Sequence, residues 1–184
     1  MDELKSAWEI AEQRASRLGR LSAEEQQQQE RDRCHQIGRV LAAKWLDGHE
    51  RLDLTAELGT YGKENRTAVK RAVIEHLVEA IEPSSPGNAD RVTRAIAGIE
   101  GLAPELQPEI DEIRRLLHEY AEAERKARQE MENTCRESLH RLRISGTAVA
   151  GINIEATEEW QEAHQRLVED FTPRFNDVKQ ALTR

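Results

Sequence analysis

The chain has 184 residues, with a hydrophobic content of 38% and an aromatic content of only 4%. Its 27 basic and 35 acidic residues give a formal net charge of −8, which argues against sequence-independent binding to nucleic acids or anionic membranes. The longest apolar runs are far shorter than the roughly 20 residues of a transmembrane helix, so we expect no membrane span.

The N-terminus does not resemble a secretion signal, because Met1 is followed by acidic residues and no apolar run comes after them. The two cysteines, Cys34 and Cys135, lie far apart in a chain without export features, so we expect both to be reduced thiols. These features predict a cytoplasmic protein.

The first 48 residues predict two amphipathic helices. Between Leu4 and Leu18 the apolar residues recur at steps of three and four, as they do on one face of a helix. Ser22 and Glu25 have the spacing of a capping box, in which each side chain binds the backbone N–H of the other residue. We therefore expect a second helix to begin at Ala23.

Residues 49–100 predict a short helix followed by a helical hairpin. A strong amphipathic pattern runs from Glu64 to Glu82, and a further helix is expected from Ala89 to Glu100. Between them, residues 83–88 are all proline, serine, glycine or asparagine, which are typical turn residues. The two helices are therefore expected to pack against each other as an antiparallel pair.

The longest predicted element is a helix at about 108–142, which starts at a proline suited to the first turn of a helix. About 35 residues at 1.5 Å each correspond to a rod of roughly 50 Å. Such a rod is longer than a compact domain of this size requires, so we expect its middle to project or to pair with another helix. The expected stripe is Ile110, Ile113, Leu117, Tyr120, Glu124, Ala127, Met131, Thr134, Ser138 and Leu142.

The segment at about 144–154 is the one stretch that resembles a strand, because it is rich in glycine and β-branched residues and lacks charge. Thr157 then predicts the N-cap of a final helix. The apolar rhythm of this helix continues across Pro173, which predicts a kinked helix or two stacked ones. Its stripe is Trp160, His164, Leu167, Phe171, Phe175, Val178 and Leu182.

The chain lacks the motifs of common catalytic, cofactor and metal sites. Glu137 and His140 have the spacing of one half of a di-metal site, but a second Glu-x-x-His pair is missing. Structural zinc sites usually contain paired ligands such as Cys-x-x-Cys, and neither Cys34 nor Cys135 belongs to such a pair. The glycine-rich stretch at 146–151 is not followed by the Lys-Ser/Thr of a phosphate loop. We therefore predict no catalytic residues, no cofactor and no metal.

These elements predict an all-α fold, a multi-helix bundle with one long coiled-coil-like helix and a short extended segment before the C-terminal helix. The expected regions form one domain overall: an N-terminal helical region (1–83), a loop (84–88), a helix pair that includes the long helix (89–143), and the extended segment with the C-terminal helix (144–184).

The function expected from these features is that of a non-catalytic helical interaction protein, such as an accessory, scaffolding or assembly factor. The low aliphatic content predicts burial against a protein partner or against a second copy in a homo-oligomer. Apolar residues on the last helix are expected to pack in the protein's own core and are, as the alternative, candidate contact residues for a partner. They are Trp160, Phe171, Phe175 and Val178. The alternative functions are a helical-bundle metalloprotein or enzyme, and a nucleic-acid- or ribosome-associated factor.

Overall fold

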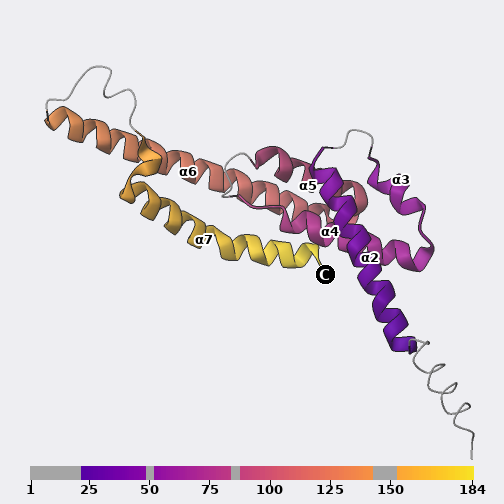
Figure 1. The fold of residues 1–184 in the computed structure, drawn as a ribbon. Coiled ribbons are helices and arrows are strands. Elements are labelled where there is room, and N and C mark those ends of the chain that lie inside the picture. Colours follow the sequence, from indigo (N-terminus) through magenta and orange to yellow (C-terminus); the bar gives the residue numbers. More distant parts are fainter. Residues whose placement is uncertain (1–21, 49–51, 84–87, 143–152) are drawn as a thin grey trace, which may run out of the picture.

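The computed structural model describes residues 22–48, 52–83, 88–142 and 153–184, and every regular element in these ranges is helical (Figure 1). This confirms the expected all-α fold. The helix expected between Leu4 and Leu18 and most of the expected extended segment, residues 144–152, lie outside the described residues. The described elements are α2 (Ala23–Leu46), α3 (Leu54–Gly59), α4 (Lys63–Glu79), α5 (Ala89–Leu102), η1 (Pro104–Leu106), α6 (Gln107–Arg141), η3 (Ile154–Ala156) and α7 (Glu158–Leu182).

The ends of the helices follow local sequence signals. At the start of α2, Ser22 Oγ accepts a hydrogen bond from Glu25 N at 3.1 Å, and the Glu25 carboxylate accepts one from Ser22 N at 2.7 Å. The predicted capping box is thus present. α4 ends at Glu79, three residues before the expected end at Glu82; in a continued helix Pro83 would have no N–H to donate to the Glu79 carbonyl, and its ring would clash with that carbonyl.

The helix α4 forms the centre of a body made of α2, α3, α4 and α5. Its inward residues recur at every fourth position and are fully buried. They are Val69, Val73, Leu77 and, just past the helix end, Ile81. α2 packs along one side of α4 and α5 along another, as expected for the predicted hairpin of α4 and α5.

The contact between α2 and the helices beside it is unusually close. Gly38 of α2 lies directly against Ala72 and Val73 of α4, where a Cβ on Gly38 would come within 2.5 Å of Ala72 Cβ. Nearby, Trp45 Nε1 donates a hydrogen bond of 2.7 Å to the Arg94 carbonyl, and Arg94 donates one of 2.9 Å to the Leu46 carbonyl. These contacts join α2 to both α4 and α5.

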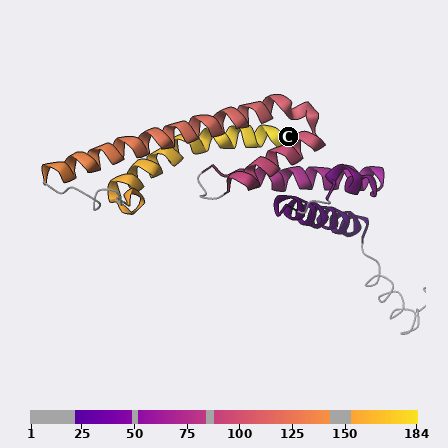
Figure 2. The ribbon, with the colours of Figure 1, turned by 90° about the horizontal axis from the view of Figure 1, so that it is seen from above.

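α6 and α7 lie side by side and form an arm that extends away from the body (Figures 1 and 2). In Figure 2 the arm is one layer, α4 and α5 are the next, and α2 lies on the far side. The half of the arm near the end of α6 has no described element of the body beside it in either view. α6 has 35 residues, in agreement with the predicted rod.

The C-terminal region begins with η3 and continues as one helix. Ile154 opens the 3₁₀ turn of η3, so the expected extended segment does not reach this residue. Pro173 lies inside α7, and the helix continues through it to Leu182. None of the helices that the structure describes has the length and apolar character needed to cross a membrane.

Candidate interaction surface on the helical arm

The position where α7 begins is set by Thr157. Its Oγ1 accepts a hydrogen bond from Trp160 N at 3.2 Å and donates one of 2.8 Å to the Ile154 carbonyl. The same hydroxyl therefore caps α7 and closes the turn of η3 before it. Glu158 and Glu159 in the first turn are favourably placed for the helix dipole.

We expect Thr157→Ala to lower the free energy of unfolding by about 1 kcal/mol, the usual cost of losing an N-cap. Thr157→Ser keeps the hydroxyl and should retain most of the stability. Urea unfolding followed by circular dichroism measures both variants. Equal losses in the two would show that the methyl group of Thr157, not its hydroxyl, sets the start of α7.

The aromatic stripe of α7 packs mainly on the protein's own helices. Trp160, Phe171 and Phe175 are 6%, 9% and 3% exposed, whereas Val178 is half-buried. The ring of Phe171 contacts the ring of Tyr120 on α6 in an edge-to-face arrangement, with centroids 5.5 Å apart. Of the candidate residues for partner contact, Val178 is therefore the most exposed, and the rings of Trp160 and Phe171 lie against α6.

Three polar side chains meet halfway along the arm. The Tyr120 hydroxyl lies 3.2 Å from His164 Nε2, and Glu124 Oε1 lies 3.7 Å from the same nitrogen. Burial raises the pKa of Tyr120 and the nearby charge of Glu124 raises it further, so the phenol stays protonated and available as a donor. This cluster joins α6 to α7.

The pairing of the two arm helices ends near Arg128. The Arg128 guanidinium lies 5.3 Å from the centroid of the Trp160 ring and forms a 2.7 Å ion pair with Glu155. Because α7 runs antiparallel to α6, its first residue Glu158 and the turn η3 are level with this part of α6. α6 continues for another 13 residues, or about 20 Å, past this point.

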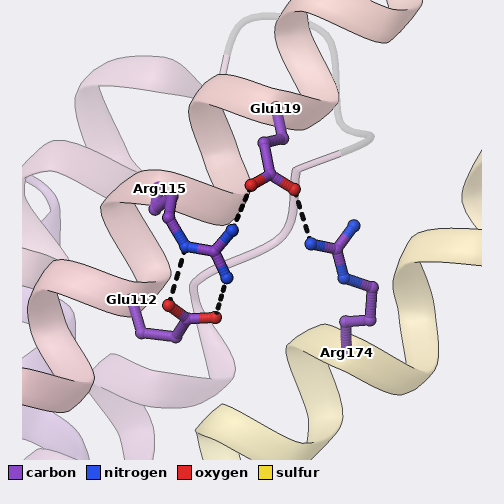
Figure 3. Close-up of polar contacts among 4 residues, drawn as sticks. All are labelled: Glu112, Arg115, Glu119 and Arg174. Carbon is purple, nitrogen blue, oxygen red and sulfur yellow. Dashed lines mark hydrogen bonds and ion pairs between the residues drawn. The ribbon is translucent and has the colours of Figure 1, made fainter.

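At the other end of the arm, charged residues hold α6 to α7 (Figure 3). Arg115 binds both Glu112 and Glu119 on α6, and Arg174 of α7 binds the second carboxylate oxygen of Glu119. The Arg174 hydrogen bond lowers the pKa of Glu119, and Arg115 lowers that of Glu112. Both carboxylates are therefore charged at neutral pH, and the ion pairs link the two helices.

Beyond Arg128, α6 carries a partly open apolar stripe, which we call the distal face. It consists of Met131, Cys135, Leu139 and Leu142. The first three are half-buried, and Leu142 is 70% exposed. In a helix these four positions fall within about 80° of one another, in line with Tyr120 on the stripe that α7 covers.

The polar contacts described for the distal part of α6 lie within that helix. Among the described residues, the side-chain hydrogen bonds and ion pairs of α6 after Arg128 stay within α6, such as Glu132–Arg136 at 3.3 Å and Glu137–Arg141 at 3.7 Å. The stripe of α6 that faces α7 thus continues past the position where α7 begins.

A groove of about 290 Å³ lies where α7 passes the end of α4. Its walls include Tyr120, Phe171 and Phe175, and Lys179 stands at its rim. Burial lowers the pKa of Lys179, although the charges of Glu82 and Glu79 act in the opposite direction. The groove offers aromatic surface and one amine, and none of the distal-face residues lines it.

Residues weighed as metal ligands do not come together in the described part of the chain. There, no three His, Cys, Asp or Glu side chains are close enough to hold a metal ion. The carboxylate of Glu137 pairs with Arg141. Cys34 is 3% exposed inside the body, and burial raises the pKa of its thiol.

Sequence reasoning missed part of the distal face. The predicted stripe followed Met131 to Thr134 and Ser138, but the half-buried positions are Cys135 and Leu139. The signal was available, because Met131, Cys135 and Leu139 recur at every fourth residue, which also places them on one side of a helix. The link between Tyr120 and His164, 44 residues apart, had no local signal.

The described structure is thus an all-α protein in two parts, a body of α2 to α5 and an arm of α6 and α7. Residues 55–184 match the model of a family of unknown function, DUF6657, and the chain belongs to this family. The matched range contains the whole arm and leaves α2 outside. No curated protein and no solved structure shows a significant match to the chain.

Proposed function

We propose that the protein is a non-catalytic helical interaction protein, an accessory, scaffolding or assembly factor that acts through protein–protein contacts of its arm. The observation that carries this proposal is the distal face, where an apolar stripe continues beyond the helix that covers it. Leu142 alone leaves 70% of its surface open. Amphipathic helices commonly bind a partner through such a stripe.

The polar groups of the arm support the same role. Arg174 binds Glu119, and His164 contacts Tyr120, so these side chains serve to hold α6 against α7. The distal face extends along α6 from about 5 Å to about 20 Å beyond the last contacts with α7. The net charge of −8 favours a protein partner over nucleic acid, and a cytoplasmic location remains part of this proposal.

The test compares proteins captured by the tagged full-length chain with those captured by a distal-face variant, Met131→Gln, Leu139→Gln and Leu142→Gln. Capture is carried out in extracts of the native cell, which also contain untagged copies of the chain. Losing an apolar anchor at an interface costs about 1–2 kcal/mol, so we expect capture by the variant to fall about tenfold.

The matched control is Val40→Gln, since Val40 on α2 is also an exposed apolar residue, at 50%. It should capture the same proteins as the wild type. Circular dichroism establishes that the variants remain helical. Equal capture by the distal-face variant and the wild type would contradict the proposal.

A further inference from the structure

We draw no further inference here: the strongest candidate, the partly open apolar stripe of the distal face at the end of α6, belongs to the surface already proposed for partner binding, and nothing in the described structure shows what covers it.

Discussion

Replacing Phe171 by alanine should lower the free energy of unfolding by about 3–5 kcal/mol. Phe171 is 9% exposed, its ring contacts Tyr120 across the arm, and the guanidinium of Arg174 lies 4.9 Å from its centroid. The substitution removes the ring from the middle of the interface between α6 and α7 and leaves a cavity. For a chain of this size the loss corresponds to a fall in Tm of roughly 6–20 °C, measured by circular dichroism.

The matched control is Asn176→Ala, an exposed position on the same helix. Exposed substitutions usually change stability by less than about 0.5 kcal/mol, so this variant should melt close to the wild type. A normal Tm for Phe171→Ala together with weaker binding to a partner would show that Phe171 acts at an external interface, the other role left open by the sequence.

The helices of the arm could be predicted because their patterns are local. Ile110, Ile113 and Tyr120 recur at helical spacing, and all three are buried where they face the rest of the molecule. Farther along α6 the predicted stripe drifted to Thr134 and Ser138. A strict heptad drifts by about 20° per seven residues relative to a straight α-helix, so small errors accumulate along a long rod. In the part of α6 that α7 does not reach, the sequence offered no contact with a second helix from which the position of the stripe could be corrected.

The sequence could not show how far the arm helices overlap. The overlap depends on which residues of α7 meet α6, and the pairing of His164 with Tyr120 is set by the whole fold. Because of that overlap, α7 begins near Arg128 and does not reach the distal face. Sequence periodicity identifies an apolar stripe, but tertiary structure decides which part of it is covered.

Close helix contacts in the body are a second feature that local patterns cannot predict. Gly38 and Gly101 are both glycines within helices, in α2 and α5, where alanine is favoured by about 0.5–1 kcal/mol over glycine. Propensity alone therefore predicts that alanine stabilises both positions. The structure separates them: a Cβ on Gly101 meets no atom within 4 Å, whereas one on Gly38 lies 2.5 Å from Ala72 Cβ and 2.9 Å from Val73 N.

We therefore expect Gly101→Ala to raise the free energy of unfolding by about 0.5–1 kcal/mol and Gly38→Ala to lower it by about 1–3 kcal/mol. The atoms that Gly38→Ala would strike belong to the α4 backbone and to a Cβ next to it, so no flexible side chain can move aside. α2 must instead shift away from α4, which loosens the contacts of Trp45 with Arg94. Urea unfolding of the two variants, with tryptophan fluorescence to follow that shift, measures the difference. A stabilised Gly38→Ala protein would mean that α2 and α4 do not approach as closely as described.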